Sequence, residues 1–262
     1  SILLAGLFAS GQTSVSEPAL TRNHTEAMLK GFGYLVSRKK NTISIKGGGN
    51  LIGTKIEIPS DISSAAFFMV GASIAPGSDI TIEQVGLNPT RNGVVKILKK
   101  MGADISVINE RKIGGEAVGD LRVRHARLKG IEIPKKFVPL AIDELPAILI
   151  AAACAEGRTV LRGAEELRVK ESDRIESMAE GLSRLGVANT VFADGIEVVG
   201  GMLSGGTIDT HYDHRIAMSF SMAALKASGQ IKIMDCSHVA TSFPSFASLA
   251  KKAGLNLTVL DL

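Results

Sequence analysis

The sequence predicts an α/β (α+β) protein made of repeated βαβαββ units that pack around a shared axis. Two observations indicate this fold. An apolar, Ala-rich segment followed by glycine and a short alternating strand occurs four times, and an amphipathic segment ending in an apolar residue and glycine occurs three times. The copies recur about every 70 to 80 residues, which is too long for a common solenoid repeat.

The apolar segments predict four helices, at residues 2–11, 62–77, 145–157 and 216–229, each ending in glycine. The strands expected after them lie at 13–15, 80–82, 159–161 and 231–233. Because the pattern begins inside the first of these helices, we expect the chain to be the C-terminal part of a longer protein.

The amphipathic segments predict a second set of helices, which end at Phe32-Gly33, Met101-Gly102 and Leu185-Gly186. In the middle copy, apolar residues at 94, 97, 98 and 101 follow the spacing of one helix face. Alternating strands are expected after these helices, at 43–45, 105–107 and 196–198. A further recurring piece, Ile-Glu-Ile-Pro, stands at 56–59 and 131–134, with a weaker copy at 208–210.

Composition narrows the class of protein. The 262 residues are 45% hydrophobic and 21% charged, which suits one large or two small cores and excludes a disordered polymer. The net charge of +4 is too small for a dedicated nucleic-acid binder unless it is clustered, and 4% aromatic residues provide few surfaces for stacking bases. We therefore expect no nucleic-acid partner.

The apolar stretch at residues 1–10 resembles the core of a signal peptide but lacks a basic segment before it. No stretch reaches the roughly 18 apolar residues that a membrane-spanning helix needs. Cys154 and Cys236 form no C-x-x-C motif, which fits a reducing compartment. We expect a soluble, cytoplasmic protein that does not bind membranes.

Charged residues cluster where the apolar helices are expected to begin. Asp61, Asp143 and Asp213 precede three of them, and helix capping alone would explain Asp61. A second carboxylate, Glu144, follows Asp143, so capping and a functional role are equally open there. Arg215 lies in a first helical turn, where a cation opposes the helix dipole unless an anion binds beside it. This position favours a functional role.

The densest group of charges, at residues 165–174, lies just before an amphipathic helix. Lys170 and Arg174, four residues apart, would share one face of its first turn. Glu171 between them is a candidate carboxyl whose protonation the neighbouring charges would tune. The alternative is a solvated loop in which Ser172 merely caps the helix.

A third basic helix start lies at residues 21–26, where Arg22 precedes a plausible capping box of Asn23 and Glu26. Three helix starts with arginine or lysine beside them predict a small polyanionic substrate, and two phosphates and a carboxylate would suit them. The histidines lack metal-binding spacing, so we expect no metal. Nucleotide-binding glycine motifs and a G-x-S-x-G nucleophile motif are missing from the sequence.

Two segments are specific enough to indicate a family. LRVKESDRI at 167–175 and YDHRIAM at 212–218 resemble the signature segments of the 5-enolpyruvylshikimate-3-phosphate synthases, or 3-phosphoshikimate 1-carboxyvinyltransferases. Segments 59–66, 85–91 and 240–244 support the resemblance, which runs over essentially the whole chain. It implies the enolpyruvyl transferase fold, with two inside-out α/β barrel-like domains of three βαβαββ units each. Residues 1–59 would end the first domain, and 60–262 would form most of the second.

The resemblance implies transfer of the enolpyruvyl group of phosphoenolpyruvate to the 5-hydroxyl of shikimate 3-phosphate, with release of phosphate. The reaction passes through a tetrahedral intermediate and needs no metal or cofactor. Motif matching assigns catalysis to Asp143, Glu171 and His214, shikimate 3-phosphate binding to Arg22, Asp143 and Lys170, and phosphoenolpyruvate binding to Arg174 and Arg215.

The chain departs from the family pattern in two respects. Many members carry a lysine before Thr-Phe-Pro, whereas Thr241 precedes Ser-Phe-Pro here, which with Arg22 resembles the branch that includes glyphosate-tolerant enzymes. The family's early Lys-Ser, Asn-Ala-Gly and Ser-x-Gln segments are absent, so we expect the chain to hold about half of the active site and to be inactive alone.

Two alternatives stay open. One is the related enolpyruvyl transferase that acts on UDP-N-acetylglucosamine, although we do not expect it to carry both signature segments. The other is a catalytically silent module that binds anions or the missing N-terminal segment. Under the main prediction as well, we expect a monomer.

Overall fold

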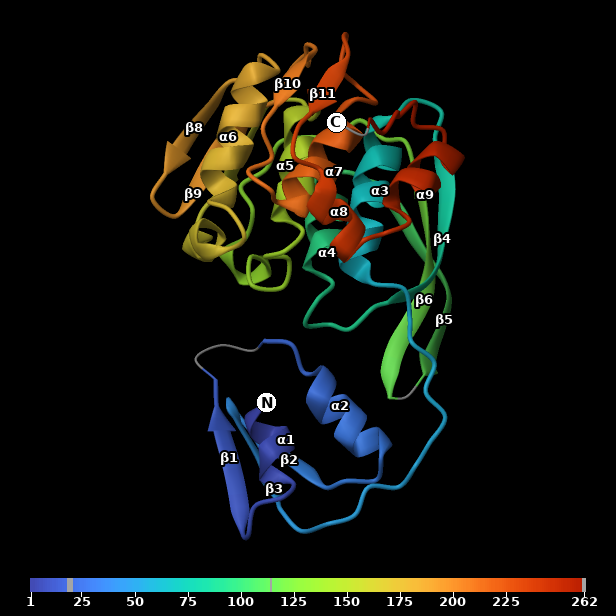
Figure 1. Ribbon diagram of the computed structural model, residues 1–262, viewed down its shortest axis with the longest axis vertical. Coiled ribbons are helices and arrows are strands. Elements are labelled where there is room, and N and C mark those ends of the chain that lie inside the picture. Colours follow the sequence, from blue (N-terminus) through green and yellow to red (C-terminus); the bar gives the residue numbers. More distant parts are fainter. Residues whose placement is uncertain (18–20, 114, 261–262) are drawn as a thin grey trace.

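The computed structural model describes residues 1–17, 21–113 and 115–260, which form two lobes joined by an extended segment (Figure 1). The smaller lobe holds one three-stranded sheet and two helices. Its elements are α1 (Ile2–Gly6), β1 (Gln12–Ser16), α2 (His24–Gly31), β2 (Val36–Lys39) and β3 (Thr42–Lys46).

The larger lobe, from residue 60 onward, contains two copies of the order helix, strand, helix, strand, strand, and part of a third. The first copy is α3 (Ile62–Ile74), β4 (Asp79–Gly86), α4 (Gly93–Lys100), β5 (Asp104–Ile113) and β6 (Glu116–Arg124). The second, preceded by the 3₁₀ turn η1 (Lys135–Phe137), is α5 (Leu145–Ala153), β7 (Arg158–Leu161), η2 (Glu165–Val169), α6 (Arg174–Arg184), β8 (Asn189–Phe192) and β9 (Gly195–Val199). The last part is β10 (Gly206–Ile208), α7 (His214–Ala223), β11 (Ile231–Ile233), α8 (Ser237–Ser242) and α9 (Phe246–Lys252).

Strand order repeats with the sequence units. The three larger sheets are ordered β1-β3-β2, β4-β6-β5 and β7-β9-β8, with every pair antiparallel, and β10 pairs in parallel with β11. The pieces at 56–59 and 131–134 belong to no named strand. Ser60, directly after the first piece, and Glu132, within the second, form isolated parallel bridges with Val85 and Val160. These bridges extend the antiparallel sheets by a single residue pair each.

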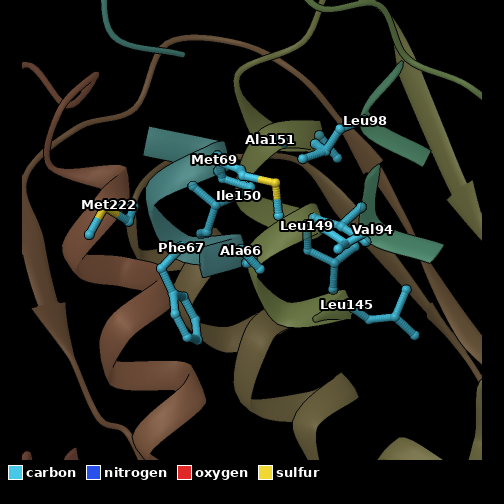
Figure 2. Close-up of a cluster of buried hydrophobic side chains, with 14 of the residues drawn as sticks. Ala66, Phe67, Met69, Val94, Leu98, Leu145, Leu149, Ile150, Ala151 and Met222 are labelled. Atoms are coloured by element: carbon cyan, nitrogen blue, oxygen red, sulfur yellow. The ribbon is translucent and has the colours of Figure 1, made fainter. Parts of the chain in front are cut away.

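Three apolar helices form the centre of the larger lobe. Helices α3, α5 and α7 pack against one another, and the sheets lie outside them (Figure 1). Every residue of α5 is buried, as expected for a helix that is hydrophobic all round. Figure 2 shows this contact, with α4 also contributing, through the labelled side chains Ala66, Phe67, Met69, Val94, Leu98, Leu145, Leu149, Ile150, Ala151 and Met222. Helices inside and sheets outside are the inside-out arrangement that the sequence predicted.

The amphipathic helices α4 and α6 end at the predicted glycines. The apolar helices end earlier than predicted: α1, α3, α5 and α7 end at residues 6, 74, 153 and 223 instead of 11, 77, 157 and 229. Gly102 and Gly186 follow α4 and α6 with φ of 93° and 80°, the left-handed conformation that favours glycine at a helix end. The two lobes have separate hydrophobic clusters, and among the described residues the buried members of the smaller cluster are Leu29, Tyr34 and Ile45. The division at residue 59 into two domains stays a prediction. Within the described residues, no helix combines the length and apolar character required to cross a membrane.

Candidate active site

Four cations surround one carboxylate at the end of the larger lobe that faces the smaller lobe. Asp143, just before α5, forms an ion pair with Arg22 of the smaller lobe. Lys170 Nζ lies 3.9 Å and Arg174 Nη1 3.8 Å from its Oδ1, and Arg215 Nη2 lies 3.9 Å from its Oδ2. Arg215 Nη1 also donates to the Asp143 backbone carbonyl at 2.9 Å. The fold therefore brings together all five of the predicted binding residues, from segments far apart in the sequence.

The electrostatics keep Asp143 ionised. Burial alone would raise the pKa of this carboxyl, but the charges of Arg215, Arg22 and Lys170 together outweigh it and hold the pKa below its ordinary value. The separations near 3.9 Å are too long for hydrogen bonds. Lys170 and Arg215 therefore stand close to Asp143 without a hydrogen bond to its carboxylate. Lys170 instead pairs with the more exposed Glu166, a partner that a bound anion could replace.

Arg174, the first residue of α6, is held in a buried ion-pair network. Its side chain is 1% exposed, its Nε donates to Asp213 Oδ2 at 2.7 Å, and its Nη2 donates to Glu171 Oε2 at 2.6 Å. Asp213 is fully buried and also accepts from Ser172 Oγ at 3.1 Å and from the Arg215 backbone N–H at 2.8 Å. Burial would raise the pKa of Asp213, but the hydrogen bond and charge of Arg174 lower it below its usual range. The network leaves Arg174 Nη1 directed toward Asp143.

The two other predicted catalytic residues lie at the edge of this network. Glu171 is half exposed and pairs through Oε2 with Arg174. His214, the first residue of α7, is partly buried. Burial and the charge of Arg215 lower the pKa of its imidazole, so His214 is neutral at pH 7. The site therefore combines an ionised carboxylate, an accessible carboxylate and a neutral imidazole.

Two predictions about the 165–174 segment are wrong in detail. Asp173, not Ser172, caps α6, because its Oδ1 accepts from the backbone N–H groups of Ile175 and Glu176 at 3.1 Å. Lys170 lies before the helix, beside the end of η2, so it does not share a helical turn with Arg174. Lys170 comes near Asp143 through the loop between η2 and α6.

Capping was also predicted wrongly at two other helix starts. Asn23 occupies the N-cap position of α2 without a side-chain cap bond, and Glu26 instead accepts from Arg38 at 2.7 and 3.0 Å. Asp61 occupies the N-cap position of α3, but its carboxylate pairs with Arg91 at 3.0 Å. Guanidinium groups compete effectively for these carboxylates because such pairs combine charge with hydrogen bonding.

The structure excludes one of the alternatives for Asp143, that it caps α5; its functional role stays a prediction. Glu144, not Asp143, takes the N-cap position of α5, and the Asp143 carboxylate faces the cations. Glu144 is 3% exposed, accepts a hydrogen bond from Ser63 Oγ, and has a pKa that burial raises above its ordinary value. Sequence reasoning missed this role for Glu144 and the contact of Arg91 Nη2 with Ser63 Oγ at 2.6 Å. Two consecutive carboxylates before an apolar helix were the only local signal.

No cluster of three or more His, Cys, Asp or Glu side chains in the described part of the chain is arranged to hold a metal ion.

Comparison with known proteins decides the family. The family described as EPSP synthase (3-phosphoshikimate 1-carboxyvinyltransferase) matches residues 1–249. The chain belongs to the EPSP synthase family. Within the family, it is 62% identical over 258 residues to the 3-phosphoshikimate 1-carboxyvinyltransferase of Alkalilimnicola ehrlichii, and 59% identical over 258 residues to that of Methylococcus capsulatus.

Each of these alignments covers 98% of the chain, and they cover 58% and 59% of the two relatives. The chain thus spans about three fifths of the length of the curated EPSP synthases that it matches. The structure resembles EPSP synthase from Acinetobacter baumannii with a TM-score of 0.96 and 58% identity, covering 99% of this chain and 60% of that one. The enolpyruvyl transferase NikO from Streptomyces tendae matches with a TM-score of 0.78 at 20% identity, covering 97% of this chain and 58% of that one, and shows the fold alone. The predicted enolpyruvyl transferase fold is confirmed.

Proposed function

We propose that this chain carries one part of an enzyme that transfers the enolpyruvyl group of phosphoenolpyruvate to the 5-hydroxyl of shikimate 3-phosphate. The observation that carries the proposal is the ionised Asp143 carboxylate among Arg22, Lys170, Arg174 and Arg215. Both substrates are anions, and a cluster of cations at helix starts offers the charge that they need. The same cluster places a potential base beside the bound anions.

Asp143 is the proposed base for the attacking hydroxyl. The hydroxyl oxygen forms a bond to C2 of phosphoenolpyruvate while Asp143 takes its proton, and C3 gains a proton to give a tetrahedral intermediate. Loss of a C3 proton and departure of phosphate then restore the double bond. In the free protein the surrounding cations make Asp143 a weak base. Bound anions would offset those cations and raise its pKa toward a useful range.

Glu171 is the proposed acid and base at C3. Its half-exposed carboxyl is accessible to water and substrate while Arg174 holds one oxygen. We propose that the neutral His214 contributes to catalysis from the start of α7, as motif matching indicates.

The cations divide between the substrates. Arg22 and Lys170, with Asp143, would hold shikimate 3-phosphate, and Arg174 and Arg215 would hold phosphoenolpyruvate. Arg174 is already bound through Nε and Nη2, so its Nη1 is the nitrogen left for a substrate carboxylate or phosphate. This arrangement would orient the anion without moving the buried guanidinium.

A further stretch of polypeptide, present in the relatives, would complete the site. The smaller lobe and the extended segment after it expose large apolar side chains, including Phe8, Leu35 and Ile58 at 91%, 89% and 88%. Apolar side chains gathered in a lobe with so small a core mark a surface that another part of a protein covers. We propose that the segment corresponding to the unmatched part of the relatives packs here and supplies the remaining substrate contacts, in a cytoplasmic monomer.

Phosphate release tests the function. The assay uses phosphoenolpyruvate with shikimate 3-phosphate, on this 262-residue chain and on a polypeptide that also carries the additional N-terminal stretch of a relative. We expect turnover only from the longer polypeptide. Turnover with UDP-N-acetylglucosamine but not with shikimate 3-phosphate would overturn the proposed acceptor. Binding of both substrates by the longer polypeptide without phosphate release would instead indicate a silent anion-binding module.

A further inference from the structure

Three consecutive residues provide the polar contacts between the lobes. Among the residues that the structure describes, every hydrogen bond or ion pair linking the two lobes involves Arg22, Asn23 or His24. We call residues 22–24 the arm. Arg22 contacts the active site, whereas Asn23 and His24 contact a separate place on the larger lobe. The two kinds of contact therefore serve different purposes.

Asn88 is a rigid anchor for the arm. It lies between β4 and α4, is 5% exposed, and donates through Nδ2 to Asn23 Oδ1 at 2.8 Å and to Glu116 Oε2 at 3.2 Å. Its Oδ1 accepts from both the backbone N–H and the hydroxyl of Thr90, at 2.9 and 2.7 Å. Because its own lobe holds the amide on one side, Asn88 presents a fixed donor to the arm on the other.

Glu116 is the second anchor. It begins β6, at the turn end of the β5–β6 hairpin, which reaches down beside α2 (Figure 1). Its Oε1 lies 2.6 Å from His24 Nδ1, and its side chain is 16% exposed. The hairpin thus connects the β4-β6-β5 sheet to the first residue of α2.

The ion pair between Arg22 and Asp143 cannot fix the arm unaided. The Arg22 side chain is 52% exposed, and ion pairs at such exposure contribute little because water screens them. A substrate phosphate would also compete with Asp143 for Arg22. When Arg22 changes partner, the contacts of Asn23 and His24 are the ones that would still hold the arm in place.

We propose that Asn88 and Glu116 are positioning residues that dock the arm, so that Arg22 stays at the site while it passes from Asp143 to the substrate phosphate. This inference rests on the proposed function, in which Arg22 binds shikimate 3-phosphate. The exchange of partners also leaves Asp143 free to act as a base. The hydrogen bonds of Asn23 and His24 lie outside the site, so they need not break when Arg22 changes partner.

A double-mutant cycle tests the inference in the longer polypeptide. Asn88→Ala and Glu116→Gln should each raise the KM for shikimate 3-phosphate about tenfold and change kcat less than about threefold, with little effect on the KM for phosphoenolpyruvate. If these residues act through Arg22, Asn88→Ala should add nothing further in an Arg22→Ala background. Effects that multiply in the double variant would overturn the proposal.

Hydrogen exchange provides a readout without activity. In the 262-residue chain, amides 24–31 should exchange faster in Asn88→Ala and Glu116→Gln than in the parent chain. Glu83→Gln, an exposed carboxylate on the same sheet, is the matched control and should leave exchange unchanged. Unaltered exchange in both test variants would overturn the docking role even if the enzyme is active. The two proposals can also fail separately. If the longer polypeptide has no activity with shikimate 3-phosphate but the two test variants still exchange faster, the proposed function is refuted and the docking role is retained.

Discussion

Arg22 and Asp143 form an ion pair across the two lobes although they lie 121 residues apart in the sequence. The pair joins a residue of the smaller lobe to the segment before α5, at the centre of the cation cluster. In the free protein, Arg22 therefore occupies the carboxylate that we propose as the base. In the proposed mechanism, this contact would link substrate binding to the basicity of Asp143.

The first prediction concerns the charge that Arg22 places beside Asp143. Arg22→Ala removes one of the cations that lower the pKa of this carboxyl, so that pKa should rise. Since the base must be ionised, the acid limb of the kcat/KM pH profile should move to higher pH. Because Arg22 is also proposed to bind the substrate phosphate, the KM for shikimate 3-phosphate should rise about tenfold or more. Arg158→Ala, which removes a surface arginine paired with Glu197, is the control. An acid limb that stays in place would contradict the electrostatic link.

The second prediction concerns the buried pair of Arg174 and Asp213. Asp213→Asn removes the charge that compensates a guanidinium only 1% exposed, and breaking a buried pair costs about 3 kcal/mol or more. In a domain of this size the melting temperature should fall by roughly 10 °C. Asp104→Asn breaks a surface pair with Arg124 at 2.9 Å and should cost at most about 1 kcal/mol. Equal losses from the two variants would show that the Arg174 pair has no special role.

Asp213 also predicts how stability depends on pH. Its pKa in the folded protein lies below the value in the unfolded chain, about 3.9. Its contribution is therefore complete above pH 4 and is lost as the pH falls through the folded-state pKa. Urea unfolding between pH 3 and pH 7 should show a smaller acid loss in Asp213→Asn than in the parent chain. Parallel curves for the two proteins would refute this assignment.

The third prediction concerns Glu144, whose pKa shifts in the opposite direction. Burial raises the pKa of this carboxyl in the folded protein. The free energy of unfolding therefore falls as the pH rises from the pKa of the unfolded chain to that of the folded protein. Glu144→Gln removes the ionisation but keeps an oxygen for Ser63. The variant should gain free energy of unfolding relative to the parent as the pH rises above the unfolded-state pKa of about 4.3. A difference between the two proteins that does not change with pH would show that the pKa of Glu144 is not raised by folding.

Local sequence patterns predicted the helices, most of the strands and the charged helix starts, because periodicity and glycine helix ends act over a few residues. They failed where a distant partner decides the outcome. Asn23 and Glu26 have the spacing of a capping box, but Arg38 from β2 takes the Glu26 carboxylate. The pair of Arg174 and Asp213, 39 residues apart, leaves no local signal either. The individual roles of the site residues stay predictions from motif matching.

The fourth prediction tests the contact between α6 and α7. At Gly181 an added Cβ would overlap the ring of Phe220, which is itself fully buried. Gly181→Ala would gain up to about 1 kcal/mol of helix propensity, but overpacking a tight core contact costs about 1–3 kcal/mol. At Gly201 nothing lies within 4 Å of an added Cβ, so Gly201→Ala is the matched control and should be near neutral. We expect urea unfolding to show a net loss for Gly181→Ala alone, with Phe220→Leu in the same chain recovering part of it by making room for the methyl group. A Gly181→Ala variant more stable than the parent would mean that α6 and α7 can move apart without loss of stability. The close packing of these two helices could then not explain why Arg174, at the start of α6, lies opposite Asp213, at the start of α7.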